Sequence, residues 1–265
     1  MFKSRCCVTL AVIYCLAGAL TPTALGADRK DVIREARRSY YDLKSKGLAG
    51  FECQVSMDWD SMFKTLKPDA TGRDQVIPIL KKTQFQVLVG PEGASTVSHH
   101  SDVAPPNEEV AGRVRQSTGG VEQVLTGFFQ TWSGFMMGAP FPEADGDYLL
   151  ENLGENYRLT YKETSVDVVI SMAHDFTIDE MRVTTPDFEA RVHPEFARNQ
   201  GEFVLLGYEA TYKAASGAPQ QLSMKIENRD VQGFSLPATV TATVDLPAGK
   251  LEMPLIFSDC KVTKR

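Results

Sequence analysis

The chain has 265 residues, of which 43% are hydrophobic, and it carries 28 Lys and Arg against 34 Asp and Glu for a formal net charge of −6. Phosphate binding needs clustered basic side chains, so an acidic chain of this kind is a poor candidate for nucleic-acid binding. Its length suffices for one large domain or two small ones, and size alone does not choose between them.

The first 26 residues have the pattern of an export signal. Lys3 and Arg5 form a short positive region, an apolar run covers 6–20, and Ala24 and Gly26 offer small residues to a signal peptidase. The run is shorter than the roughly 20 residues that cross a bilayer, which favours cleavage over an uncleaved membrane tether. We therefore expect a signal peptide at 1–26, and a mature protein at 27–265 that is periplasmic or secreted.

The number and positions of the cysteines also fit an exported protein. Cys6, Cys7 and Cys15 lie in the expected signal, which leaves Cys53 and Cys260 in the mature chain. An even number of cysteines in an exported chain indicates a disulfide, with two buried free thiols as the alternative. A bond between these two would tie the first strand of the mature chain to the last, which favours a single domain.

The mature chain opens with a predicted helix over 28–46. Apolar residues recur there at three- and four-residue spacing, Asp28 stands as a candidate N-cap, and Gly47 follows the last apolar position. Several Arg and Lys residues cover the opposite face. We interpret them as a solvated face, with contact to a membrane surface as the alternative.

Alternating apolar and polar residues predict a strand over 51–59 that has one buried and one solvated face, and a second strand over 84–89. The intervening stretch, 61–82, is expected to hold one or two short helices. Pro68 and Pro78 would break them, because proline lacks the backbone donor that a helix interior needs.

The centre of the chain is expected to be a long loop, a helix and a second loop. The stretch 90–107 is rich in Gly, Ser and Pro and is interpreted as a loop. A helical pattern follows over 108–138, with a break expected at Gly119-Gly120. A second loop is expected over 139–147.

From Tyr148 onward the pattern is mostly β. Short, turn-rich links between strands predict an antiparallel meander, since parallel neighbours need long crossovers. About ten strands are too many for a small flat sheet, so we expect a strongly curved sheet or half-barrel with helices on its concave side. The apolar parity changes near Ser258-Asp259, which predicts a β-bulge there. The expected strands are 157–163, 165–172, 177–184, 188–192, 202–214, 221–229, 238–245 and 251–262.

The strongest candidate for a binding surface is apolar and lies in the second half of the predicted central helix. Its side chains are adaptable, because methionine fits irregular shapes and recurs at promiscuous surfaces. Two interpretations stay open: the face is core that fills the concavity of the sheet, or acyl chains share that concavity. The residues are Phe128, Phe129, Trp132, Phe135, Met136 and Met137.

No catalytic or cofactor motif stands out in the sequence, which contains no G-x-S-x-G, P-loop, H-E-x-x-H or Gly-rich dinucleotide turn. His99 and His100, with Asp102 nearby, come closest to a metal site. Adjacent side chains of an extended segment point in opposite directions, so this pair is not expected to chelate one ion. We expect no metal and no cofactor.

Carboxylates cluster around the second loop, at Glu143, Asp145, Asp147 and Glu151. Paired acids can cleave a glycosidic bond, and acids close in sequence can bind calcium. The more ordinary interpretation is that these side chains keep the loop solvated.

Three local phrases carry a resemblance to a known family: 40–48 followed by 51–53, the strand pair at 175–183, and the closing segment 256–262. With an export signal, an N-terminal helix, covering helices and a long meander, the chain resembles the LolA/LolB/LppX-like fold. Members of that group are periplasmic carriers of lipoproteins and lipids.

The resemblance implies a hydrophobic cavity between an incomplete barrel and a helical lid, non-covalent binding of acyl chains, and no enzymatic activity. The implied partners are lipid or lipoprotein acyl chains, with envelope membrane proteins as a further class, and the protein is expected to be a monomer. Two alternatives remain: a structural envelope protein that acts through protein contacts, and a hydrolase of envelope polymers.

Overall fold

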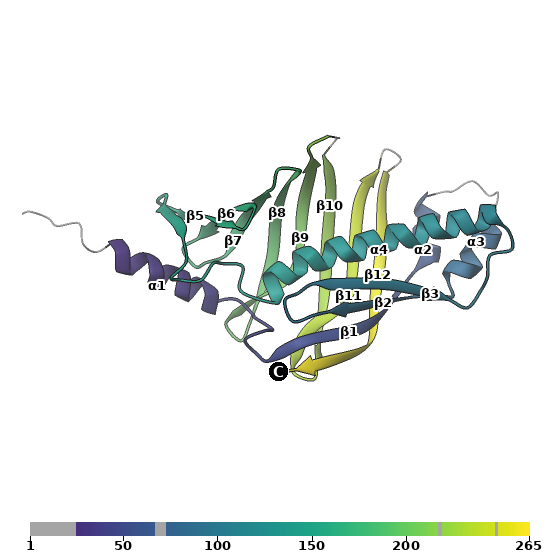
Figure 1. Ribbon diagram of the computed structural model, residues 1–265, viewed down its shortest axis with the longest axis horizontal. Helices are drawn as coiled ribbons and strands as arrows, with labels where there is room; N and C mark the ends of the chain where they lie inside the picture. The colour runs from purple at the N-terminus through teal and green to yellow at the C-terminus, as the bar shows by residue number, and fades with distance from the viewer. Residues whose placement is uncertain (1–24, 67–72, 217–218, 247–248) are drawn as a thin grey trace, which may run out of the picture.

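A computed structural model of the chain describes residues 25–66, 73–216, 219–246 and 249–265 (Figure 1). The expected signal peptide falls mostly outside these described residues. Over the described ranges the fold is mostly β, as the sequence predicted, and its strands form one antiparallel sheet. The strands are β1 (Leu48–Met57), β2 (Thr83–Val89), β3 (Ser95–Ser101), β4 (Tyr148–Asn152), β5 (Asn156–Glu163), β6 (Val166–Ala173), β7 (Ile178–Thr184), β8 (Phe188–Asn199), β9 (Glu202–Ala214), β10 (Gln220–Val231), β11 (Phe234–Leu246) and β12 (Gly249–Lys264).

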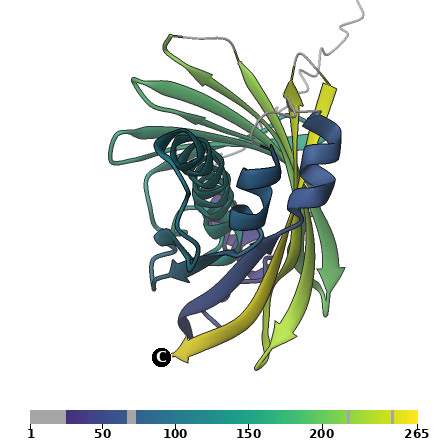
Figure 2. The same ribbon diagram turned by 90° about the vertical axis from the view of Figure 1, so that its right-hand side faces the viewer.

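The helices lie outside the single sheet. The longest helix lies along one face of the sheet, and Figure 2 shows it nearly end-on with the long strands beside it. Its main contacts are with β3, β9 and the short helix before β2. The helices are α1 (Leu25–Arg38), α2 (Trp59–Leu66), α3 (Arg73–Leu80) and α4 (Glu108–Met136).

Neighbouring strands follow one another in the chain at every position of the sheet except one. The order is β3-β2-β1-β12-β11-β10-β9-β8-β7-β6-β5-β4, so the exception is the antiparallel pair β1 and β12. This pair joins the beginning of the sheet to the end of the chain. The meander confirms what the short links predicted, and β3 and β4 form the two open edges.

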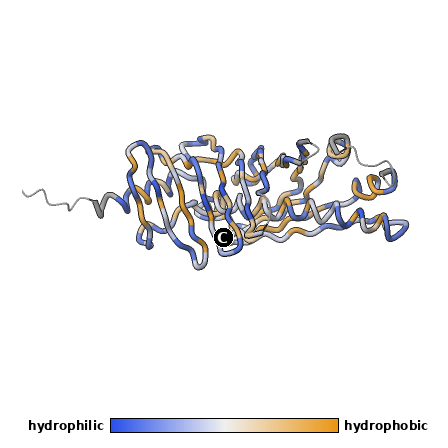
Figure 3. Tube along the Cα trace, turned by 90° about the horizontal axis from the view of Figure 1, so that it is seen from above, coloured by the Kyte–Doolittle hydropathy of each residue, from blue (hydrophilic) through white to orange (hydrophobic). Residues whose placement is uncertain are grey.

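The core lies between α4 and the sheet face that α4 covers. In β1, Phe51, Cys53 and Val55 are each 1% exposed, while Gln54 between them faces solvent. Figure 3 shows the same alternation of apolar and polar positions along the strands. Period-two alternation places one face of a strand against the core and the other in water, as the sequence predicted for this segment.

Helix α4 is continuous, so the predicted break at Gly119-Gly120 is wrong. The helix begins after Asn107, whose side-chain oxygen accepts a hydrogen bond from the Val110 backbone N–H at 2.9 Å. Glycine inside a helix costs about 1 kcal/mol relative to alanine. Burial of Thr118 and Val121 on either side of the glycines holds the helix against the core and offsets that cost.

Helix α1 ends at Arg38, well before the predicted end at 46. The chain leaves the helix to pair with β9: the Tyr41 N–H donates to the Phe203 carbonyl at 3.0 Å, and the Phe203 N–H donates to the Ser39 carbonyl at 2.7 Å. The carboxylate of Asp42 then accepts from backbone N–H groups two and three residues further on, at 2.9 and 3.1 Å. Tertiary pairing and this turn replace the last helical turns that spacing alone predicted.

The stretch 90–107, which the sequence predicted as a loop, contains strand β3. It pairs with β2 along its whole length, from Thr83 opposite Ser101 to Val89 opposite Ser95. Most of its side chains are exposed or half-buried, because it is an edge strand. It therefore shows no clear apolar alternation. The short edge strand β4 was also not predicted, because only one of its five side chains, that of Leu150, is buried.

Two helices occupy the stretch between β1 and β2, in agreement with the prediction for 61–82. Helix α3 contains Pro78 and ends two residues later, at Leu80. Pro68 falls outside the described residues. Within the ranges that the structure describes, none of the helices is long and apolar enough to cross a membrane.

The predicted β-bulge is present near the end of β12. Asp259 has φ of +48°, and the pairing with β1 changes register between Glu52 and Gln54. An extra residue on one strand turns the following side chains to the other face. This change of face brings Cys260 opposite Cys53.

Candidate functional site

The aromatic face of α4 forms the centre of the hydrophobic core. Phe128, Phe129 and Trp132 have no exposed surface. The ring centroids of Phe51 on β1 and Trp132 lie 5.7 Å apart, edge to face, and those of Phe129 and Phe257 on β12 lie 5.9 Å apart in the same arrangement. Edge-to-face pairs add to the stabilisation from burial, so these rings fix α4 on the sheet.

The six side chains that the sequence suggested as ligand contacts are between 0% and 4% exposed, and all belong to the hydrophobic core. A role in ligand binding stays a prediction for them. Met137, just past the end of α4, has a second environment because it also lines a cavity. The full set is Phe128, Phe129, Trp132, Phe135, Met136 and Met137.

This cavity, of about 500 Å³, lies beyond the C-terminal end of α4 and is called the apolar cavity below, after its one apolar wall. Charged side chains line much of the rest of it: Arg37, Asp42, Lys44, Glu92, Glu143 and Glu163. Figure 1 shows β5, β6 and β7 continuing past that end of the helix. Tyr161, Val168 and Val183 form one row across these strands, because Tyr161 pairs with Val168 and Val168 with Val183. Met181 belongs to the same wall, and Phe141 of the loop between α4 and β4 also lines the cavity.

A second cavity, of about 540 Å³, adjoins the first and is called the polar cavity below. Three arginines of α1, Arg34, Arg37 and Arg38, contribute to its lining. Arg37 and Glu143 line both cavities. The two spaces therefore meet at a charged junction. The first has an apolar wall beyond it, and the second is lined by the three arginines together with Asp42, Glu143, Asp145 and Glu202.

The loop over 139–147 lies across this junction and is tied to α1. The Arg37 guanidinium donates to the Phe141 carbonyl at 2.5 Å and to the Glu143 carboxylate at 2.7 Å. Lys30 donates to Asp145 at 2.6 Å. The basic face of α1 was interpreted from sequence as solvated, and the structure shows that part of it holds this loop.

Tyr40, which lines the polar cavity, anchors the chain between α1 and β1. Its hydroxyl donates to the Phe176 carbonyl at 2.8 Å and accepts from the Ile178 N–H at 3.1 Å, which ties it to the turn before β7. Burial raises the pKa of Tyr40 far above its ordinary value, so the hydroxyl stays neutral. These bonds fix the position of α1 relative to the strands that form the cavity wall.

Tyr161 supplies a hydroxyl to this wall, which Glu163 on the same strand also lines. Burial raises the pKa of Tyr161, nearby Glu163 raises it further, and the positive charge of Arg37 acts in the opposite sense. Within the part of the chain that the structure describes, this hydroxyl makes no hydrogen bond to another residue. A ligand atom in the cavity could therefore use it.

The acids around the second loop are arranged as ion-pair partners. A hydrogen bond from Lys30, with the charge of Lys30 adding to it, holds the pKa of Asp145 below its ordinary value. A general acid near neutral pH needs the opposite shift. Across the described ranges, no three His, Cys, Asp or Glu side chains gather in a way that could hold a metal ion.

His99 and His100 have different partners, as expected for adjacent residues of a strand. His99 Nδ1 lies 2.7 Å from a carboxylate oxygen of Glu122 on α4, whereas His100 Nε2 lies 2.9 Å from Asp102. The side chain of His99 is 34% exposed and that of His100 is 80% exposed. The pair therefore links β3 to α4 on one side and faces solvent on the other.

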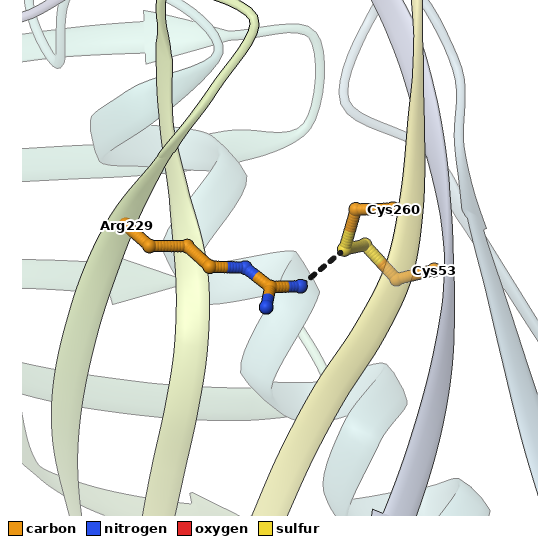
Figure 4. The surroundings of a disulfide bond; sticks show 3 residues. All are labelled: Cys53, Arg229 and Cys260. Atoms are coloured by element: carbon orange, nitrogen blue, oxygen red, sulfur yellow. Dashed lines mark hydrogen bonds between the residues drawn. A yellow bond between two sulfur atoms is a disulfide. The ribbon is translucent and has the colours of Figure 1, made fainter.

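The predicted disulfide between Cys53 and Cys260 is present and joins β1 to β12 (Figure 4). Arg229 on β10 points toward it, and its guanidinium lies 3.5 Å from the Cys260 sulfur. Disulfides persist in oxidising compartments and are rare in the cytosol, so this bond indicates a non-cytosolic location.

Comparison of the chain with protein-family models, with curated proteins and with solved structures finds no match. The resemblance to lipoprotein carriers therefore remains an expectation from the sequence.

Proposed function

We propose that the protein is an exported, non-enzymatic carrier that binds acyl chains of lipids or lipoproteins in the apolar cavity. In this proposal the sheet acts as a half-barrel whose concave side is only partly filled by α4. The observation that carries it is the unfilled space beyond the end of α4, walled by Val168, Met181 and Val183.

The size of the cavity suits an apolar chain, because small-molecule sites typically measure about 300–1,000 Å³. Val166, Val168, Met181 and Val183 offer such a chain one apolar wall, and charged side chains line much of the rest of the cavity. Each buried methylene contributes about 0.8 kcal/mol before ordering costs. A volume of about 500 Å³ favours one acyl chain at a time over several.

Export is the second part of the proposal. The positive region, apolar run and small residues of 1–26 support a cleaved signal. The disulfide supports an oxidising destination, for which we propose the periplasm. A carrier there would shield acyl chains from water without catalysing a reaction.

Filling the cavity tests the proposal. Val183→Phe places a ring on the cavity wall, so we expect binding of a fluorescent long-chain fatty acid to fall at least tenfold, because the chain and the ring compete for one space. Binding is measured by fluorescence titration of delipidated protein, and circular dichroism reports whether the variant is folded.

Val169→Phe is the matched control. Val169 neighbours Val168 on β6 and pairs with Arg182, so it lies on the opposite face of the sheet from the cavity wall. We expect this variant to bind the probe like the unaltered protein. Equal binding by all three proteins, or no binding by the unaltered protein, would contradict the proposal.

A further inference from the structure

Arg37 lies at the boundary between the two cavities. Its side chain is 27% exposed and lines both cavities. The guanidinium carries five N–H donors, and its bonds to the Phe141 carbonyl and to Glu143 leave others unused. A partly desolvated arginine with unused donors is well suited to bind an anion.

The Tyr161 hydroxyl is a second donor on the cavity side of this junction. Tyr161 lies in the wall row with Val168 and Val183, so its ring continues the apolar surface. Its hydroxyl makes no hydrogen bond within the described part of the chain. Such a donor, beside the apolar side chains of the wall, would orient one oxygen of a bound ligand.

We infer that the ligand is a single-chain amphiphile with an anionic head, which Arg37 and the Tyr161 hydroxyl bind while the chain lies along Val168, Met181 and Val183. This inference rests on the proposed carrier function and names its ligand class. A carboxylate or a phosphate head fulfils the requirement equally, because both present oxygen atoms to a guanidinium.

Four carboxylates line the cavity, those of Asp42, Glu92, Glu163 and Glu143, and the last is the one that pairs with Arg37. The side chain of Glu143 is 79% exposed, so its ion pair with Arg37 is a surface pair. Exposed ion pairs contribute about 0–1 kcal/mol, and such a carboxylate can turn to water at little cost. The ligand head would take its place on the guanidinium and leave the bond to the Phe141 carbonyl intact.

The experiment compares ligands that have the same chain length and different head groups. Dodecanoate, dodecyl phosphate and dodecanol displace a fluorescent fatty acid from the delipidated protein, and the inhibition constants are compared. We expect one or both anions to bind at least tenfold more tightly than the alcohol, since a hydrogen bond to a charged group is worth that much or more. The stronger of the two anions then indicates whether the source is a fatty acid or a lipid phosphate.

Two variants test the named donors. We expect Arg37→Gln and Tyr161→Phe each to weaken anion binding about tenfold while dodecanol binding stays within twofold, because neither removes the apolar wall. Arg158→Gln on β5 is the matched charge control. It neighbours Leu159, which is buried, and faces the other side of the sheet, so anion binding should stay unchanged.

Glu143→Gln separates head-group binding from a role of Arg37 in holding the loop. It breaks the ion pair but leaves the guanidinium in place, so we expect anion binding to be retained or tightened. A loss equal to that in Arg37→Gln would overturn the inference, as would equal binding of the acids and the alcohol. If none of the three compounds binds, the carrier proposal itself fails.

Discussion

At the scale of single residues, Trp132 and Phe135 distinguish between two interpretations of the aromatic face of α4, as packed core or as ligand pocket. Both are at most 1% exposed, and the ring centroid of Phe135 lies 5.8 Å from that of Phe196 on β8. Side chains enclosed in this way stabilise the fold whether or not a ligand is bound. Their burial favours the interpretation of this face as core.

Replacing Trp132 and Phe135 together by serine should therefore prevent folding. A single large-to-small change of a buried aromatic costs about 3–5 kcal/mol, and a domain is stable by only about 5–15 kcal/mol. Far-ultraviolet circular dichroism and urea titration measure the effect. A double variant that has the same urea midpoint as the unaltered protein and has lost only lipid binding would show instead that these rings form the pocket.

Some features of the site follow from residues in sequence and others do not. The pairing of Cys53 with Cys260 was predictable, because only two cysteines follow the expected signal peptide and they leave one pairing. The cavity wall was not, because Val168 and Val183 show only that one face of each strand is apolar. Whether that face meets a helix or an empty space depends on where α4 ends relative to distant strands.

At the scale of elements, α4 shows how packing overrides local preference. The helix continues through Gly119 and Gly120, both exposed, since buried residues on either side hold it against the core. A methyl group built at either glycine would have no atom within 4 Å. The two glycines therefore cost stability without serving a visible steric need.

Gly119→Ala and Gly120→Ala should each raise the free energy of unfolding by about 1 kcal/mol, the difference in helix propensity between the two residues. Thermal unfolding followed by circular dichroism measures it. Gly50→Ala in β1 is the opposing control, because its methyl group would lie 2.5 Å from the Val89 carbonyl oxygen and should destabilise the protein. No gain from either helix substitution would contradict a continuous α4.

The strands that could be predicted from sequence are those with one buried face. Strand β1 and most strands from β5 to β12 alternate, and they were placed to within a few residues except where a strand extends further, as β8 does beyond Val192. The edge strand β3 was missed because most of its side chains are exposed or half-buried, and β4 because it is only five residues long with one buried side chain, Leu150. The end of α1 was misplaced because a contact with distant Phe203 decides it.

At the scale of the whole molecule, the pair β1 and β12 joins segments 207 residues apart in sequence through the disulfide. Every other strand pair joins neighbours in the chain. The bond therefore closes a loop that contains nearly the whole sheet. Such a closure lowers the conformational entropy of the unfolded state and hardly changes that of the folded state, so it stabilises the fold.

Removing the disulfide with Cys53→Ala and Cys260→Ala should lower the free energy of unfolding by about 4–5 kcal/mol if chain entropy dominates. Urea titration of the oxidised protein and of the double variant measures the difference. A reducing agent should shift the unaltered protein toward the variant and leave the variant itself unchanged. Equal stability with and without reductant would show that the bond contributes nothing to the fold.

For the whole molecule, we propose that one acyl chain occupies the apolar cavity. The most direct measurement is native mass spectrometry of the mature protein, purified gently from a periplasmic extract, with organic extraction of what is bound. We predict one stoichiometric adduct that extracts as a single-chain lipid and is absent from Val183→Phe. A bare protein mass that stays unchanged after incubation with lipid vesicles would contradict the account.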